Sequence, residues 1–167
     1  TELERFLHFF PQDELVPKVR TLIGLCYLQA KQYEKAREIL EDLRRTYAGK
    51  PLEGEALFMI GESYYRQGIY AEAERIFKQL SEESPVPEIR NRAAYRLGWC
   101  RMKGDRWKDA SETFGKVERT SPLYPSARDL TGRSLDGSAL PSKEPARIPV
   151  SATLTASGTR TGSWPFS

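Results

Sequence analysis

Five residues recur three times along this chain at a constant spacing of 37 residues. The middle copy consists of Gly61, Tyr70, Ala73, Phe77 and Leu80. The preceding copy holds Gly24, Tyr33, Ala36, Leu40 and Leu43, and the following copy holds Gly98, Trp107, Ala110, Phe114 and Val117. A period of this length is typical of stacked repeat proteins, because a single unit cannot bury its apolar face without its neighbours.

The middle copy predicts the local structure of each unit. The stretch from Gly61 to Phe77 has the pattern of one helix ending, a tight turn and a second helix beginning. Small residues at Gly61 and Ala73 would let the two helix axes approach closely, while Tyr64, Tyr70 and Phe77 would fill the seam between them. Prolines near the end of each unit, which cannot continue a helix, would terminate it.

These residues resemble the tetratricopeptide repeat family, which has a large residue, Gly and an aromatic on its first helix, and an aromatic, Ala and Phe on its second. The middle repeat matches with Ile60, Gly61, Tyr64, Gly68, Tyr70, Ala73, Phe77 and Pro85. The third repeat matches with Leu97, Gly98, Trp107, Ala110, Phe114 and Pro122, but has Arg101 where an aromatic is expected. The first matches with Ile23, Gly24, Tyr27, Tyr33, Ala36 and Leu40, but has Lys31 in place of the second Gly. The resemblance implies an all-α fold, a right-handed α-α superhelix of antiparallel helix pairs.

The period is longer than the usual one of about 34 residues. A longer period with Pro near the close of each unit is similar to the variant found in bacterial envelope proteins, including outer-membrane assembly lipoproteins and cell-division coordinators. This resemblance implies a periplasmic or envelope-associated location in preference to a cytoplasmic one.

The register predicts a helical domain over residues 1–136 and a Ser/Thr/Pro/Gly-rich tail or linker over 137–167. Full repeats are expected at about 12–48, 49–85 and 86–122, with partial units at 1–11 and 123–136. Predicted helices cover residues 13–31, with Asp13 as cap, and 33–47, 52–67, 70–83, 87–103, 106–119 and 126–135. Phe6 lies 37 residues before Leu43. Residues 1–10 are therefore expected to be the second helix of a unit whose first helix is missing, which leaves an apolar face uncovered.

Composition excludes several classes of function. The formal net charge of +3 is small for 167 residues, so no basic face indicates nucleic-acid binding. No run of about 18 apolar residues predicts a membrane span. Cys26 and Cys100 lie two periods apart, too far for a disulfide across stacked repeats, and are expected to be free thiols.

Enzymatic motifs are absent from the sequence. It has no GxSxG, no phosphate-binding Gly-rich loop, no HExxH and no Cys/His ligand set. His8 is the only histidine and is expected on the surface. We therefore predict a protein that is not an enzyme, with no catalytic residue, no metal site and no cofactor.

The first helices supply the candidate binding surface. If the recurrent glycines face the partner helix, then residues three before, one after and four after each glycine are expected to turn toward the concave side of the stack. The predicted groove residues, with polar companions, are Leu25, Leu28, Phe58, Glu62, Tyr65, Arg66, Arg92, Tyr95, Trp99, Met102 and Lys103. Exposed aromatic and Met side chains bordered by Arg and Lys are typical of peptide-binding surfaces. The alternative, strongest for Phe58 and Tyr95, is that these side chains pack in the core.

Two functions remain open from the sequence. The first is a protein-interaction scaffold that binds a partner peptide or helix in the concave groove, as the family resemblance implies. The second is a structural spacer or oligomerisation module of a longer envelope protein, with homo-oligomers forming through the exposed terminal repeats.

Overall fold

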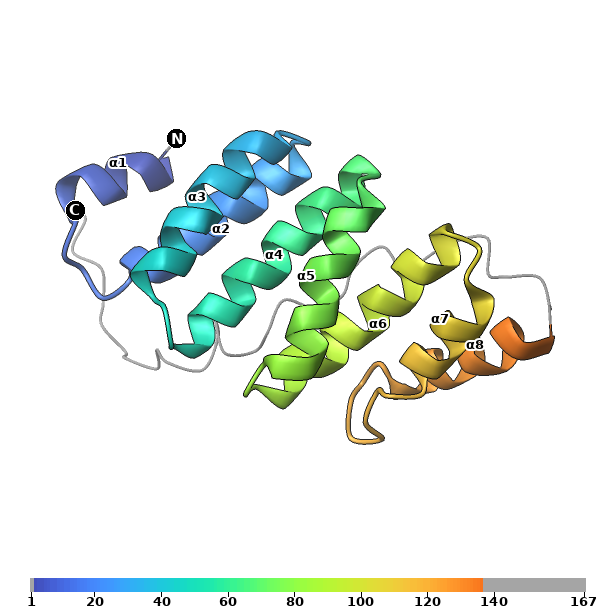
Figure 1. The fold of residues 1–167 in the computed structure, drawn as a ribbon. Helices are drawn as coiled ribbons and strands as arrows, with labels where there is room; N and C mark the ends of the chain where they lie inside the picture. The colour runs from blue at the N-terminus through green and yellow to red at the C-terminus, as the bar shows by residue number, and fades with distance from the viewer. Residues whose placement is uncertain (1, 137–167) are drawn as a thin grey trace.

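The computed structural model describes residues 2–136 and contains eight α-helices and no strand within that range (Figure 1). The tail predicted for residues 137–167 lies outside the described residues. The helices are α1 (Glu2–Phe9), α2 (Val16–Gln29), α3 (Tyr33–Thr46), α4 (Pro51–Gln67), α5 (Tyr70–Glu83), α6 (Pro87–Lys103), α7 (Trp107–Phe114) and α8 (Tyr124–Asp136). The predicted all-α solenoid is confirmed.

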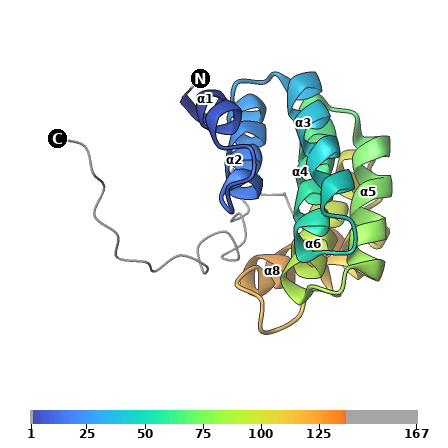
Figure 2. The ribbon, with the colours of Figure 1, turned by 90° about the vertical axis from the view of Figure 1, so that its left-hand side faces the viewer.

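The helices follow one another along an elongated stack, each packed on the next in sequence (Figure 1). Helices α2, α4 and α6 are the first helices of the three repeats, and α3, α5 and α7 are their second helices. Seen from the N-terminal end, α3 lies to one side of α2 and α5 to the same side of α4 (Figure 2). First helices of neighbouring repeats also touch, α2 with α4 and α4 with α6. The stack therefore has one layer of first helices and one of second helices.

Each helix pair closes on a glycine of its first helix. A Cβ atom added to Gly24 would lie 2.8 Å from the Leu40 side chain, and one added to Gly61 or Gly98 would lie 2.7 Å or 2.5 Å from the ring of Phe77 or Phe114. These distances are shorter than any van der Waals contact, so only glycine, which has a hydrogen in place of a side chain, fits at these positions. The glycines face the partner helix, as the repeat register predicts.

A left-handed residue turns each first helix into its second. Gly68 has a φ of 82°, and at the equivalent positions Lys31 and Asp105 have φ values of 58° and 56°. A side chain at positive φ places Cβ against the following carbonyl, at a cost of about 1–2 kcal/mol. The departure from the family pattern at Lys31 therefore leaves the turn unchanged in shape but strained.

Several predicted helix ends differ in the structure, and α2 ends at Gln29 instead of residue 31. Helix α2 begins at Val16 instead of residue 13, because the Asp13 carboxylate accepts a hydrogen bond from the Leu15 N–H (2.8 Å) and closes a turn before the helix. Pro17 lies in the first turn, where its missing N–H has no intrahelical partner to lose. Helix α7 stops at Phe114, before Gly115, and α8 is longer than expected, since it begins at Tyr124.

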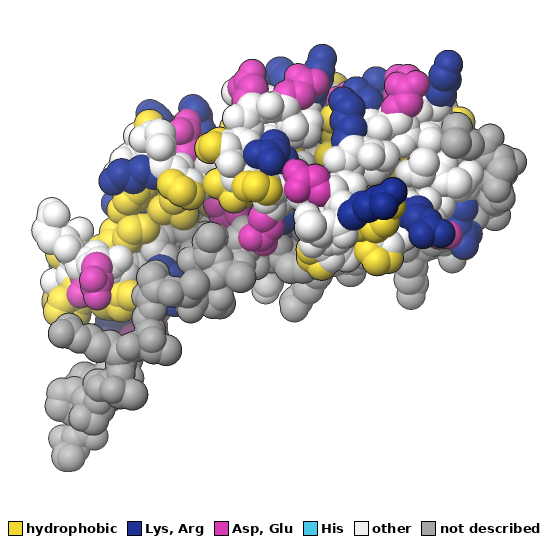
Figure 3. Space-filling model, turned by 90° about the horizontal axis from the view of Figure 1, so that it is seen from below, with side chains coloured by type: hydrophobic (Ala, Val, Ile, Leu, Met, Phe, Trp, Pro, Cys, Tyr) yellow, Lys and Arg dark blue, Asp and Glu magenta, His cyan; other side chains and the backbone are white. Residues whose placement is uncertain are grey.

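The two ends of the stack have opposite surface chemistry. Phe9, Phe10 and Leu22, near the N-terminal end, are 65%, 55% and 39% exposed. Figure 3 shows hydrophobic side chains gathered over that end, formed by α1 and α2. At the other end, α8 exposes Arg128 and Asp129 and buries Ala127 and Leu130 against the stack. Helix α8 acts as a polar cap, whereas nothing within residues 2–136 covers the apolar face at the N-terminal end.

Both cysteines are free, as predicted, with Cys26 exposed and Cys100 buried. Burial raises the pKa of the Cys100 thiol to about 12, which leaves it protonated and unreactive at neutral pH. None of the helices in residues 2–136 has the length and apolar character that crossing a bilayer requires.

Replacing Gly98 by Ala tests the helix seam. We expect G98A to lower the free energy of unfolding by about 2 kcal/mol, because the added methyl group displaces the ring of Phe114. The matched control is Gly132→Ala in α8, where an added Cβ has nothing within 4 Å. That variant should gain about 0.5–1 kcal/mol from helix propensity. Urea unfolding followed by circular dichroism measures both, and equal effects would contradict the packing of Gly98 on Phe114.

Exchanging residues at the left-handed turn position tests its strain. We expect Gly68→Ala to cost about 1 kcal/mol, because Ala at positive φ is strained. Lys31→Gly should instead gain roughly 0.5 kcal/mol, the relieved strain less the backbone entropy that glycine adds to the unfolded chain. Thermal unfolding of the two variants should therefore shift in opposite directions, and a loss of stability in K31G would contradict the conformation of Lys31.

Candidate inner-wall binding surface

The side of the stack lined by α2, α4 and α6 carries the predicted groove residues, and most of them are buried. The buried ones are Leu28, Phe58, Glu62, Tyr65, Arg92, Tyr95, Trp99 and Met102. Leu25 is half-buried, and Arg66 and Lys103 are exposed. We call this layer of first helices the inner wall.

The expected exposure of the aromatic and Met side chains is wrong. Residues three before and four after a helical position lie on the same face as that position. Phe58 and Tyr65 therefore share the face of Gly61, and Tyr95 and Met102 share the face of Gly98. This geometry packs Phe58 on Phe77, with ring centroids 5.4 Å apart, and Tyr95 on Phe114, at 5.6 Å.

Trp99 and Tyr65, two of the predicted groove residues, also pack against second helices. The Trp99 ring lies edge-on to Phe114, with centroids 6.4 Å apart, and only 4% of the residue is exposed. Tyr65 lies edge-on to Tyr70 at 5.4 Å. Burial raises the pKa of Tyr65, so its hydroxyl stays protonated at neutral pH. Both rings belong to the hydrophobic core of the stack.

Two buried ion pairs join α4 to α6. Arg92 donates to both carboxylate oxygens of Glu55, at 2.7 Å and 3.1 Å, and its guanidinium carbon lies 4.1 Å from the centre of the Phe58 ring. Arg96 pairs with Glu62, with one contact at 2.9 Å, and lies 5.0 Å from the centre of the Tyr65 ring. In each pair both side chains are at most 8% exposed. The inner wall therefore holds fixed charges stacked on aromatic faces between repeats two and three.

The sequence did not lead us to predict a role for Arg96, or the pairing of Glu55 with Arg92 and of Glu62 with Arg96. Glu55 and Arg92 occupy equivalent positions of consecutive repeats, 37 residues apart, with opposite charge. Equivalent residues of adjacent first helices lie next to each other in a stack. Opposite charges at equivalent positions could therefore have predicted this ion pair from the sequence. Glu62 and Arg96 are 34 residues apart and break the register, so nothing in the repeat pattern indicates their contact.

On the outer side of the stack, the contact between repeats changes its chemistry from one junction to the next. Arg37 of α3 lies 4.4 Å from the centre of the Tyr64 ring on α4 and donates to Gln67 at 2.8 Å. At the equivalent places of the next junction stand Glu74 and Arg101, which form an ion pair. The family pattern has an aromatic residue at the position of Arg101. The residue that faces this position also differs between the junctions, so Arg101 meets the Glu74 carboxylate where Tyr64 meets Arg37.

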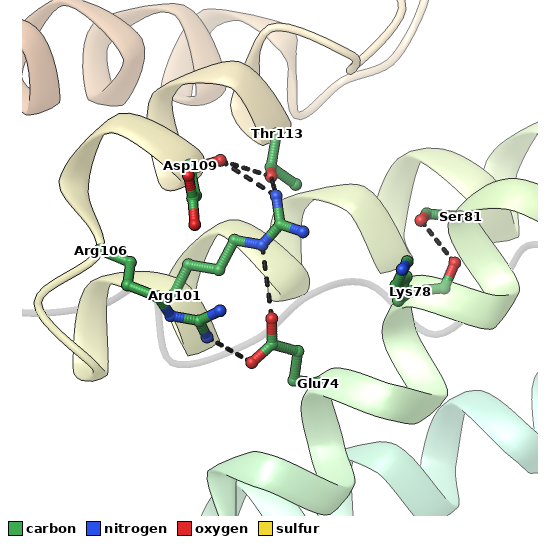
Figure 4. A network of polar contacts seen from close by, with 7 residues as sticks. All are labelled: Glu74, Lys78, Ser81, Arg101, Arg106, Asp109 and Thr113. Carbon is green, nitrogen blue, oxygen red and sulfur yellow. Dashed lines mark hydrogen bonds and ion pairs between the residues drawn. The ribbon is translucent and has the colours of Figure 1, made fainter.

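Glu74 sits at the centre of a polar network (Figure 4). It accepts hydrogen bonds from Arg101 at 3.5 Å and from Arg106, while Arg101 also donates to the backbone oxygen of Asp109 at 3.2 Å and to the Thr113 hydroxyl. Burial raises the pKa of Glu74, but the hydrogen bonds and charges of the two arginines outweigh it and hold the pKa below its usual value. This network fixes α5 to α6 and α7, with the Glu74 carboxylate held in its ionised form.

The accessible part of the predicted groove consists of polar positions near the ends of the first helices. Arg66 and Lys103, both predicted groove residues, lie 37 residues apart and are exposed, and so is Gln29 at the equivalent position of repeat one. Arg66 lies 3.7 Å from the Glu62 carboxylate. Residues 2–136 contain no group of three or more His, Cys, Asp or Glu side chains that could hold a metal ion.

Two family models and one relative identify the type of repeat. A tetratricopeptide repeat model matches residues 15–82, and a second one matches residues 92–123. The tetratricopeptide repeat protein 30 homolog of Drosophila pseudoobscura pseudoobscura is 38% identical over 61 residues, which cover 36% of this chain and 9% of that protein. A solved structure of a MamA mutant superimposes with a TM-score of 0.48 at 24% identity, over 83% of this chain and 63% of that one. The two family matches together take in more than half of the sequence, and the chain therefore belongs to the tetratricopeptide repeat family.

Proposed function

We propose that this protein is a non-catalytic scaffold that holds a segment of a protein partner against the inner wall formed by α2, α4 and α6. The observation that carries the proposal is the pair of buried Arg–Glu bridges, Glu55–Arg92 and Glu62–Arg96, stacked on aromatic rings in that wall. Burying an ion pair gives little or no net stability compared with apolar packing. The pairs would instead fix the register of α4 against α6, and so set the spacing of the exposed positions on these two helices at which a partner segment could bind.

Gln29, Arg66 and Lys103 form an exposed column at the ends of the first helices, and this column would supply the contacts with the partner. Arg66 and Lys103 carry positive charge at equivalent positions of repeats two and three, and half-buried Leu25 offers apolar area in repeat one. A partner segment with carboxylates spaced to meet Arg66 and Lys103 fits this surface, because charge complementarity speeds association and rejects wrongly charged segments. The buried aromatic rings would support these contacts from beneath rather than touch the partner.

Charge reversal at the column tests the proposal. The double variant Arg66→Glu/Lys103→Glu should lose protein partners that the unchanged chain captures from a native extract, while its circular dichroism stays helical, because both side chains are exposed. The matched control is Lys108→Glu/Lys116→Glu, which reverses two exposed charges elsewhere on the stack. Quantitative mass spectrometry of the captured proteins compares the three samples, and equal capture by both double variants would rule the column out.

Substitution of a buried aromatic residue is expected to lower the stability of the fold instead of removing a contact with the partner. Trp99→Ala should lower the free energy of unfolding by about 3–5 kcal/mol, because it leaves a cavity in the core. Loss of partner capture in this variant would therefore reflect loss of fold. If Trp99→Ala kept full stability and lost capture, Trp99 would be a direct contact instead.

A second candidate function is self-association through the N-terminal end, favoured by the exposed Phe9, Phe10 and Leu22. Large exposed apolar side chains gathered at one end are typical of interaction sites. A spacer or oligomerisation module within a longer protein would use this end. Envelope location and bacterial origin stay predictions.

Sedimentation velocity tests self-association. Oligomers of the unchanged chain should dissociate to monomers in Phe9→Ser/Phe10→Ser, because the substitutions remove apolar area that the contact would bury. Ile69→Ser, at a residue 39% exposed elsewhere in the stack, serves as control and should leave the oligomers intact. A monomeric unchanged chain at the highest soluble concentration would contradict this second function.

A further inference from the structure

The two junctions between repeats differ on the inner wall. At the second junction, between repeats two and three, Glu55 pairs with Arg92 and Glu62 with Arg96, and all four side chains are at most 8% exposed. At the first junction, between repeats one and two, the positions one period earlier are, in the same order, Lys18, Glu55, Leu25 and Met59. Glu55 is bound to Arg92 of the second junction, and Lys18 is exposed. Among residues 2–136, no ion pair joins α2 to α4.

The buried ion pairs hold α4 and α6 in one register. Sliding α6 along α4 would separate each Arg from its Glu and leave charges buried without a partner, which is strongly unfavourable. Arg92 and Arg96 also lie over the rings of Phe58 and Tyr65, at 4.1 Å and 5.0 Å from the ring centres. The same displacement would break these contacts, so repeats two and three are fixed to each other.

Both junctions have partly exposed polar contacts on their outer side. At the first junction Arg37 lies 4.4 Å from the centre of the Tyr64 ring, and Arg44 lies 3.9 Å from Glu53. The Glu74 network crosses the second junction in the same way (Figure 4). Polar contacts open to water add little net stability, because water competes for both groups. The other contact at the first junction is apolar packing, which is non-directional and tolerates small displacements.

Repeat one also has the smallest seam between its own two helices. The ring pairs that close the seams of repeats two and three are replaced by Thr21 and Leu40 in repeat one. The Thr21 hydroxyl donates to the backbone oxygen of Pro17 at 2.8 Å, a contact that often bends a helix. Lys31 closes the turn between α2 and α3 at positive φ. A unit with a smaller core and a strained turn is the one in which local rearrangement is easiest.

We infer that repeat one moves as a separate body against repeats two and three, which move together because the buried ion pairs join them. Sliding of packed helices by about 1–2 Å is a common element of such motions. This inference goes beyond the proposed scaffold function and concerns the free chain. For a partner on the inner wall, the spacing of Arg66 and Lys103 would stay fixed, while Leu25 and Gln29 would shift to fit the bound segment.

Residual dipolar couplings of the backbone amides in the free, full chain test this inference. Shear and hinge motions occur in microseconds to milliseconds, and dipolar couplings average over that range. We expect the couplings of α4 to α7 to fit one alignment tensor, and those of α2 and α3 to need a second tensor of smaller magnitude. One tensor of equal magnitude for α2 to α7 would overturn the inference. Because no partner is present, this outcome is independent of whether the inner wall binds one.

A variant without the buried charges tests their part in the motion. Glu55→Leu/Glu62→Leu/Arg92→Met/Arg96→Met replaces both pairs by apolar side chains, a change that buried ion pairs often tolerate without loss of stability. We expect α6 and α7 then to need a tensor separate from that of α4 and α5, while circular dichroism stays helical. The control Glu72→Leu/Arg75→Met removes an exposed pair within α5 and should leave the tensors unchanged. A folded variant that keeps one tensor for α4 to α7 would show that the ion pairs do not fix the second junction, and would overturn the inference.

Discussion

The whole stack depends on the contact between a glycine of each first helix and a large side chain of its partner helix. Gly61 against Phe77 and Gly98 against Phe114 bring the helices so close that a methyl group has no room. This approach buries Ala73 and Ala110 completely and seats each ring in the seam. Because a solenoid gains stability from its units and from nearest-neighbour interfaces, the geometry of these pairs also sets the spacing at which successive repeats meet.

The repeat register made the pairing of helices predictable because apolar packing within a unit depends on residues close in sequence. Gly24, Gly61 and Gly98 face their partners as expected. The orientation of the inner-wall side chains was harder, because it depends on where each residue lies around the helix. Phe58, Tyr65, Tyr95 and Met102 fall on the glycine face and are buried, so spacing from the glycine should have assigned them to the core.

Contacts between repeats were predictable only where they keep the register. Glu55 and Arg92 are one period apart and pair, whereas Glu62 meets Arg96, a residue three positions out of register. The sequence therefore contains the charges of the inner wall, but only the structure establishes their partners and their stacking on Phe58 and Tyr65.

The contacts at the two outer junctions between repeats depend on the order in which the repeats follow one another. Arg37 meets Tyr64 at one boundary, and Glu74 meets Arg101 at the next. A chain in which the first unit was followed directly by the third would set Arg37 against Arg101, two like charges. Duplicating the middle unit would set Glu74 against Tyr64 and leave that carboxylate without its arginine. The three repeats are thus not interchangeable, and rearrangements that merely add or delete a unit would lose favourable contacts at the boundaries they create.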